Sequence, residues 1–326
     1  MRVRNTEFEN VLGASGAHGF FGRAYPYHRL LRRMGLLDFT GSTFVAKTTT
    51  LHAKAGYMRL HGPERDFEPI EWFPKCIVVK PIQGVALNAV GLAGPGGPTL
   101  FDTGKWQART KPFFLSFMSV AETPAKRTEE LASFLDFLRT ELPRFKAPVG
   151  LQINYSCPNV GLHPEELVGE VTEGLHLAAA LCIPLMPKFN VLLPVETAKR
   201  ISEHPACDAL CISNTVPYGA LPNRINWRKL FGSDVSPLVE RLKGPNGEPG
   251  PPGGLSGKPL LPLLLHWLED ARNAGIKKPI NAGGGILCVE DAEAVFRRGA
   301  SSIFLGSIAF LRPFNVRGII SSMNRT

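Results

Sequence analysis

The sequence predicts an α/β fold, a single (β/α)8 TIM barrel with long βα loops over its carboxyl-end face. Two observations predict it. From Thr43 onward, short runs rich in Val, Ile, Leu and Phe alternate with amphipathic helical runs. Most of the short runs are continuously apolar, as parallel strands buried on both faces are. The chain has 326 residues, 44% of them apolar, which favours one barrel over an open doubly wound sheet.

Eight runs are predicted as barrel strands, and residues 1–42 as a lead-in to the barrel. In chain order the strands are 43–47, 84–88, 113–119, 149–156, 184–190, 208–214, 278–283 and 301–307. The regular alternation of strand and helix patterns continues along the chain. We therefore expect residues 1–326 to form a single domain.

Helical runs fall between most of these strands, at 127–142, 164–181, 194–204, 258–274 and 289–299. The first places Leu131, Phe134, Leu135 and Leu138 on one face, the spacing of a helix that covers a sheet. The Gly/Pro-rich segment 244–257 has no sustained G-x-y register, which excludes collagen. We expect it to be a long loop over the barrel mouth.

Charge and cysteine content exclude several classes of protein. The formal charge is +9, yet the basic clusters, such as Arg29, Arg32 and Arg33, never extend to five residues. We therefore expect no nucleic-acid partner, and a basic surface or an anionic substrate instead. The six cysteines include no CxxC pair, so no metal site and no disulfide framework are predicted. No apolar run is long enough to span a membrane, and we expect a cytoplasmic protein.

Polar residues follow several of the predicted strands, at the barrel end where active sites lie. They are Lys47, Asn88, Asn154 to Asn159, Lys188 with Asn190, and Ser213 to Thr215. A single Asn after a strand is usually part of a turn, but here carboxamides recur at four strand ends. Carboxamides suit a planar ligand edged with C=O and N–H groups, such as a pyrimidine. The lysines would supply charge for a carboxylate or an anionic ring.

Glycines mark the last two strands, in "NAGGGI" (281–286) and "FLGSIAF" (304–310). Backbone N–H groups approach an anion closely where side chains are small, and these two loops are the recurrent phosphate site of TIM barrels. The sequence therefore predicts a phosphorylated cofactor.

Together these motifs resemble the dihydroorotate dehydrogenases, FMN-dependent barrel enzymes of pyrimidine synthesis. "NYSCPN" (154–159) matches the family pattern N-x-S-[CS]-P-N. Further matches occur in the same order along most of the chain: "ASG" (14–16), "AKTTT" (46–50), "LNAVGLAGPG" (87–96), "MPKFN" (186–190), "SNT" (213–215), "GGLSG" (253–257), "GGGI" (283–286) and "GS" (306–307). The resemblance implies FMN as cofactor and oxidation of (S)-dihydroorotate to orotate.

The resemblance also implies roles for individual residues. Cys157 would be the base that takes the C5 proton, as in the soluble, class 1 branch, while the FMN N5 takes the C6 hydride. Lys47 would lie between flavin and substrate. The implied substrate contacts are Asn88, Asn154, Asn159, Asn214 and Thr215. The implied flavin contacts are Ala14, Ser15, Gly16, Lys47, Thr48, Asn154, Lys188, Ser213, Gly254, Gly284, Gly285, Gly306 and Ser307.

Two segments depart from the family pattern. Residues 51–87 are longer than the usual stretch around Asn-Pro-x-Pro-Arg, and "VGLHPEEL" (160–167) replaces a Gly-Lys-Pro type run. Both regions shape substrate access and the dimer contact in relatives. The exact substrate, the electron acceptor and a homodimer therefore stay open.

Three other functions are alternatives to dihydroorotate oxidation. The same chemistry would serve another dihydropyrimidine or cyclic amide. A barrel that binds a phosphorylated ligand without redox chemistry is a second alternative. A tRNA-modifying flavoenzyme is the third, although it would call for a basic RNA-binding module, and the sequence shows none.

Overall fold

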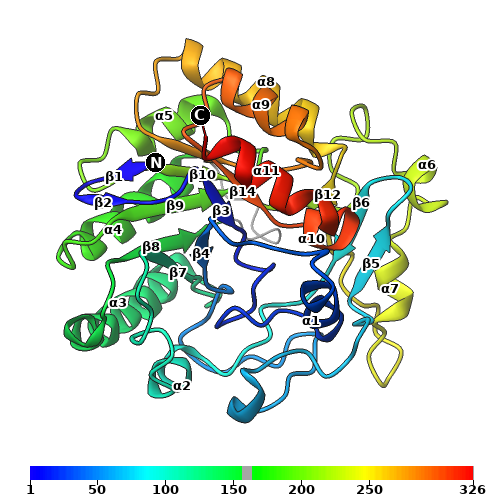
Figure 1. The fold of residues 1–326 in the computed structure, drawn as a ribbon, viewed down its shortest axis with the longest axis horizontal. Helices are drawn as coiled ribbons and strands as arrows, with labels where there is room; N and C mark the ends of the chain where they lie inside the picture. Colours follow the sequence, from blue (N-terminus) through cyan, green and yellow to red (C-terminus); the bar gives the residue numbers. More distant parts are fainter. Residues whose placement is uncertain (156–163, 326) are drawn as a thin grey trace.

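Eight parallel strands close into a barrel in the computed structural model, which describes residues 1–155 and 164–325 (Figure 1). Around the barrel the order is β10-β13-β14-β3-β4-β7-β8-β9. The strands are β3 (Val11–Gly13), β4 (Thr43–Val45), β7 (Phe113–Phe117), β8 (Val149–Asn154), β9 (Leu185–Phe189), β10 (Leu210–Ile212), β13 (Ile280–Ala282) and β14 (Ser302–Leu305). The predicted TIM barrel is confirmed.

The prediction that residues 84–88 form a strand of the barrel was wrong. Residues 84–88 contain β6 (Val85–Asn88), which lies outside the barrel and pairs antiparallel with β5 (Ile77–Lys80). The two strands form a hairpin whose turn is closed by a hydrogen bond from Gly84 N to Pro81 O, 3.1 Å long. Since β6 runs antiparallel to its neighbours, it cannot join a parallel barrel. The eighth strand of the barrel is instead β3, which lies within the predicted lead-in and pairs with β14 and β4.

Helices cover the outside of the barrel. They are α3 (Pro124–Glu141), α4 (Pro164–Ala179), α5 (Val195–Ser202), α8 (Leu260–Asn273), α9 (Val289–Arg297) and α11 (Val316–Met323). Thr123 caps α3 by accepting a hydrogen bond from Lys126 N, and Pro124 occupies its first position, as helix starts prefer. Phe134 of this helix is fully buried and stacks on Phe117 of β7 at 4.0 Å between ring centroids. Burial of each such side chain stabilises the fold by about 1.5–3 kcal/mol.

The amino ends of the barrel strands are closed by the start of the chain. β1 (Arg2–Val3) and β2 (Thr6–Glu7) form a small hairpin. Val3 and Phe8 belong to a buried cluster with barrel residues such as Phe114 and Met186, and the rings of Phe8 and Phe114 lie 4.4 Å apart. The barrel interior is thus filled with side chains at this end.

A second sheet stands beside the barrel, on the right of Figure 1. It has the order β11-β12-β6-β5, all antiparallel, with β11 (Val216–Pro217) and β12 (Gly254–Gly257). β12 is the end of the predicted Gly/Pro-rich loop, and it pairs with β6, Gly254 opposite Asn88. The long loops therefore form a sheet at the mouth.

Short elements complete the molecule: α1 (Pro26–Arg33), α2 (Gly97–Asp102), α6 (Trp227–Phe231), α7 (Pro237–Arg241), α10 (Ile308–Leu311) and 3-10 turns at Pro63–Arg65, Leu142–Arg144 and Pro313–Asn315. Within residues 1–155 and 164–325, no helix combines the length and the hydropathy needed to cross a bilayer.

Candidate functional site

A cavity of about 250 Å³ opens at the carboxyl ends of the barrel strands, between the barrel and the sheet of β12 and β6. Most of the residues predicted for the site line it: Ala14, Ser15, Gly16, Thr48, Asn88, Asn154, Lys188, Ser213, Asn214, Thr215, Gly284, Gly285, Gly306 and Ser307. They come from barrel strand ends and, for Asn88, from the second sheet. The cavity is therefore where the fold brings the predicted residues together.

Two predicted residues, Lys47 and Gly254, do not line this cavity. The Lys47 amine donates a hydrogen bond to the Ala93 carbonyl and lies over the ring of Phe20. Gly254 lies behind Thr215, where a β-carbon would clash with the Thr215 hydroxyl. Cys157 and Asn159 are outside the residues that the structure describes.

Carboxamides form one side of the cavity. Asn154 ends β8, and Asn214 follows β10. Asn214 Nδ2 donates to Asn154 Oδ1 over 3.2 Å, and Asn214 Oδ1 accepts from the Thr215 N–H over 2.9 Å. These contacts fix which face of each amide points at a ligand. The result is an uncharged edge with both donors and acceptors, suited to a flat heterocycle.

A lysine and a row of hydroxyls form the floor. Lys188 of β9 donates to Ser15 Oγ over 3.3 Å, and Thr48 Oγ1 lies 3.4 Å from the same oxygen. Thr48 in turn contacts Ser116 Oγ at 2.9 Å. Burial lowers the pKa of Lys188 below its usual range. An anionic group beside this amine would restore its preference for the charged form.

The Lys47 side chain is half-buried, and desolvation lowers the pKa of its amine to about 7. Cys76 opposes that shift, since a thiolate there would favour the ammonium. Burial, however, raises the pKa of the Cys76 thiol to about 11. The thiol is therefore neutral at pH 7 and does not offset the effect of burial on the lysine.

Glycines that follow β13 and β14 form another part of the cavity wall. Gly284 and Gly285 have φ angles of 145° and 77°, which side-chain-bearing residues rarely adopt. At Gly16 a β-carbon would meet no atom within 4 Å, so the missing side chain leaves space in the cavity. The N–H groups of Gly284, Gly285 and Gly306 have no acceptor among the described residues. Such open donors fit a phosphate group, and with Lys188 and the flat carboxamide edge the cavity fits a phosphorylated flavin.

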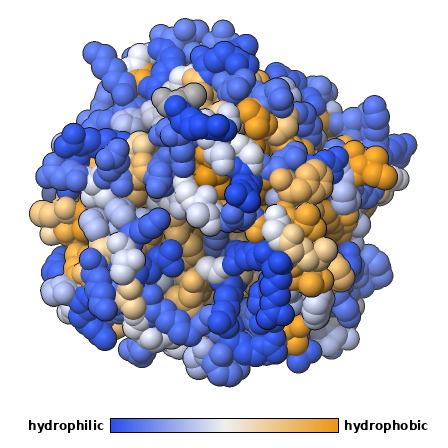
Figure 2. Space-filling view, in the orientation of Figure 1, coloured by the Kyte–Doolittle hydropathy of each residue, from blue (hydrophilic) through white to orange (hydrophobic). Residues whose placement is uncertain are grey.

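An apolar wall was missed by the sequence analysis. Tyr25, Ile77 and Phe310 line the cavity, and the rings of Tyr25 and Phe310 meet edge to face at 5.0 Å. Tyr27 continues this cluster outward and stacks on the exposed Phe73. Figure 2 shows apolar side chains gathered right of centre, in the region where Figure 1 places α10. These residues follow no motif, and only the tertiary fold brings them to the site.

Ser256 and Gly257 of β12 were missed as well, although they also line the cavity. They belong to the motif "GGLSG" (253–257), in which the family resemblance implies a flavin contact for Gly254 alone. The pairing of β12 with β6 is the signal that would have found them.

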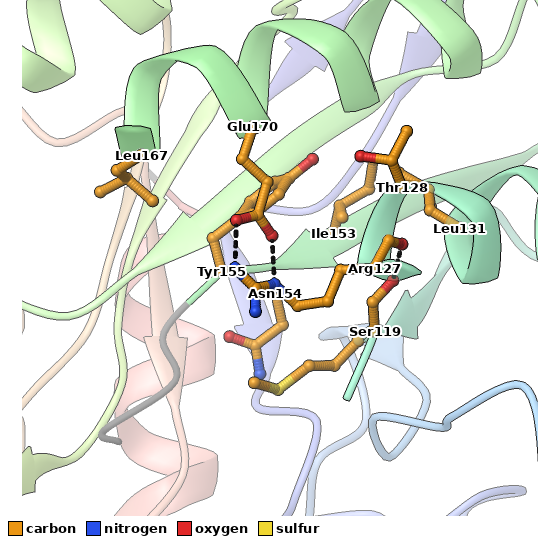
Figure 3. A pocket seen from close by; sticks show the side chains of 10 residues that line it. Ser119, Arg127, Thr128, Leu131, Ile153, Asn154, Tyr155, Leu167 and Glu170 are labelled. Atoms are coloured by element: carbon orange, nitrogen blue, oxygen red, sulfur yellow. Dashed lines mark hydrogen bonds and ion pairs between the residues drawn. The ribbon is translucent and has the colours of Figure 1, made fainter. Parts of the chain in front are cut away.

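A small second cavity of about 30 Å³ lies behind Asn154, between β8 and helices α3 and α4 (Figure 3). Arg127 and Glu170 cross it with two hydrogen bonds, of 2.8 and 2.7 Å. Arg127 also donates to the carbonyls of Ala121 and Glu122. The space suffices for about one water. We therefore interpret this cavity as part of the frame that holds the end of β8.

Comparisons with known proteins agree with the motifs. No family model matches this chain. Dihydroorotate dehydrogenase A (fumarate) of Lacticaseibacillus paracasei is 27% identical over 308 residues, covering 91% of this chain and 87% of that protein. The catalytic subunit of dihydroorotate dehydrogenase B (NAD(+)) of a Geobacillus species is 28% identical over 321 residues, covering 96% and 85%.

A solved structure supports the fold. The crystal structure of DHODH in complex with ferulenol from Eimeria tenella matches with a TM-score of 0.62 and 16% identity, covering 96% of this chain and 80% of that one. At that identity the likeness concerns the fold alone. The two sequence relatives confirm the family resemblance predicted from the motifs.

Proposed function

We propose, from the homology of this chain to the dihydroorotate dehydrogenases, that it is an FMN-dependent oxidoreductase acting on a CH–CH bond, with (S)-dihydroorotate as substrate and orotate as product. The observation that carries the proposal is the cavity itself. A carboxamide edge, a buried lysine and a wall of open N–H donors share one space at the carboxyl ends of the strands. In this proposal residues 1–326 act as one FMN-binding domain.

The carboxamide edge would bind the substrate ring. Dihydroorotate is a cyclic imide with alternating C=O and N–H groups and one carboxylate. Asn88, Asn154, Asn214 and Thr215 offer donors and acceptors at fixed positions, and Asn159 would add another. Such contacts orient the ring, so that the carbon to be deprotonated faces the base and not the solvent.

The reaction removes two hydrogens from neighbouring carbons. Cys157 would take the C5 proton, which is acidic because the carbon is next to a carbonyl. FMN, when bound, supplies the hydride acceptor for C6. A C5=C6 double bond forms, and orotate leaves. A free thiol has a pKa of about 8.5. The pKa of Cys157 must be lower than that for the thiolate to form at neutral pH, and the charge of Lys47 is a candidate cause of this lowering.

Two groups of residues would hold the cofactor. Lys188, Ser15 and Thr48 form the polar floor, where a charged amine favours an anionic ring. The N–H groups of Gly284, Gly285 and Gly306 would donate to the phosphate, with Ser307 beside them. Gly254 would act through Thr215, which it allows to sit close to β12.

The visible spectrum tests this proposal. The purified protein should show flavin absorbance, and anaerobic dihydroorotate should bleach it. Cys157→Ala should bind FMN normally and slow flavin reduction about 10²–10⁴-fold, the usual contribution of a general base, with Cys182→Ala as control. A colourless protein that takes up no FMN, or unchanged reduction in Cys157→Ala, would overturn the proposal.

A second candidate is another dihydropyrimidine or cyclic amide. The divergent segment 51–87 contributes Ile77 and Ala86 to the cavity wall, so part of the substrate pocket differs from that of relatives. Faster flavin reduction by a carboxylate-free substrate such as dihydrouracil would favour this candidate. Adding fumarate, NAD⁺ or a redox dye in separate reactions identifies the electron acceptor.

A further inference from the structure

We propose that Phe20 is a positioning residue for Lys47, holding its ammonium group beside the cavity through the face of the aromatic ring. The inference rests on the proposed function only for its catalytic consequence. The geometry is independent of it. The Lys47 nitrogen lies 4.6 Å from the centroid of the Phe20 ring, within the range of a cation–π interaction.

The ring of Phe20 is held firmly in place. Phe20 is 1% exposed, and its carbonyl accepts a 2.7 Å hydrogen bond from Trp106 Nε1. Phe67 meets it edge to face at 6.3 Å. Gly94 also lies so close that a β-carbon there would be 2.9 Å from Phe20 Cζ. The ring therefore has little freedom to move away from the amine.

The lysine is tied to the same segment. The Lys47 N–H donates to Gly19 O over 3.0 Å, which joins the end of β4 to the residue before Phe20. The side-chain amine donates to Ala93 O. Ala93 follows Leu92, whose φ of 56° is uncommon for leucine. Gly94 is fixed to Lys54 by two hydrogen bonds of 2.8 Å. Both contacts of the amine are thus rigid.

Neither contact carries a charge. The partners of the amine among the described residues are a carbonyl and a ring face, and the titratable group that acts on it is Cys76. Burial lowers the pKa of Lys47 to about 7, whereas the negative face of an aromatic ring favours the ammonium. Phe20 therefore favours the charged form of the lysine, against the effect of burial. Under the proposed function, that charge would attract the substrate carboxylate.

Titration of Lys47 in the apo protein tests the inference without any turnover. The chain is labelled with 15N-lysine, the Nζ signal is followed from pH 5 to 11, and Lys47→Arg assigns it. Phe20→Leu keeps an apolar side chain but removes the ring. We expect the pKa of Lys47 to fall by about 0.5–1 pH unit, as loss of a cation–π interaction of ordinary strength implies.

Phe134→Leu is the matched control, because it removes a ring from the same buried cluster, and that ring packs on Phe101 and Phe117 and not on Phe20. It should leave the Lys47 titration within about 0.2 pH unit of wild type, well below the cation–π effect. Equal shifts in the two variants would mean that loosened packing is the cause, and would overturn the proposal. A wild-type Lys47 that titrates near pH 10.4, as an ordinary lysine does, would also overturn the proposal.

Fluorination of the ring is a second measurement that is independent of folding. Site-specific 3-fluoro- and 3,5-difluorophenylalanine at position 20 withdraw electron density from the ring and leave Cζ, which lies against Gly94, unsubstituted. The pKa of Lys47 should fall stepwise with the number of fluorines, and no trend would contradict the inference. In the FMN-loaded protein, the alkaline limb of turnover should move down by the same amount in Phe20→Leu. If Lys47 titrates as expected in all variants but the protein does not oxidise dihydroorotate, the proposed function is rejected and the positioning role of Phe20 remains.

Discussion

Gly254 affects the cavity without lining it. It pairs with Asn88 across β12 and β6, and its lack of a side chain lets Thr215 lie against the strand. A β-carbon there would clash with the Thr215 hydroxyl and lie 2.5 Å from Thr215 Cβ. The threonine would have to move, together with the Asn214 amide that accepts from its N–H.

Gly254→Ala should therefore weaken substrate binding more than it slows the chemical step. We expect a rise in KM and a loss of about 1–3 kcal/mol in unfolding free energy, as for other overpacked positions. Steady-state kinetics and urea unfolding measure the two effects. Gly318→Ala is the control, since a β-carbon there meets no atom within 4 Å. An unchanged KM would show that Thr215 has room to adjust.

Among single residues of the site, those that directly follow barrel strands could be predicted from the sequence. Residues that reach the cavity through other contacts of the fold could not. Asn154, Lys188 and Asn214 were found because the ends of parallel strands meet at one face. Lys47 also follows a strand, yet its amine turns to the Ala93 carbonyl. That direction depends on a left-handed backbone turn at Leu92, which no local pattern indicates.

At the scale of elements, the frame behind the cavity depends on contacts between neighbouring helices. α3 and α4 are joined by the Arg127–Glu170 pair, whose side chains are 9% and 10% exposed. Arg127 also holds the β7–α3 loop through two carbonyls. The end of β8, with Asn154 and Tyr155, lies beside this pair (Figure 3). A change in this ion pair would therefore also affect Asn154 and the carboxamide edge of the cavity.

Glu170→Gln should cost about 3–5 kcal/mol of unfolding free energy, because it breaks a buried ion pair and leaves the guanidinium charge in place. The double variant Arg127→Met with Glu170→Met should recover much of that loss. Arg139→Met at an exposed pair serves as control and should cost less than about 1 kcal/mol. Urea unfolding of the three variants and of the wild type measures the difference. Equal losses in the single and double variants would contradict the expectation.

The elements that sequence patterns predicted well are the long ones. The five expected helices are present as α3, α4, α5, α8 and α9, since apolar spacing over several turns is a strong signal. β3 has three residues, all buried, and is too short to show a periodicity. β6 was placed in the barrel because apolar composition does not distinguish a parallel strand from one arm of a hairpin.

At the scale of the whole molecule, two buried histidines make stability depend on pH. Burial, with the nearby Arg32 charge, lowers the pKa of His18 and of His28 to about 3. Both imidazoles are buried, and neither Nε2 atom has a hydrogen-bond partner within residues 1–155 and 164–325. Histidine in the unfolded chain has a pKa of about 6.5, so below that pH the unfolded state binds more protons than the folded state.

Stability should therefore be complete above about pH 6.5 and fall as the pH decreases toward 3. At pH 5 each histidine should cost about 2 kcal/mol. His28→Phe, which suits the ring cluster of Tyr25, Tyr27 and Phe310, should remove about half of this effect. Urea unfolding at pH 7.5 and 5.0 measures it, with His266→Gln at an exposed site as control. A pH dependence identical to that of wild type would refute the assignment to His28.

The first barrel strand lies between the second and the last, since β3 pairs with β4 on one side and with β14 on the other. A growing chain makes β3 before the other barrel strands and β14 after them, so the ring of strands cannot close until residue 305 has been synthesised. Ser15 and Gly306, which line one cavity, follow these two strands. The cavity is therefore complete only when segments almost 300 residues apart in the sequence have met.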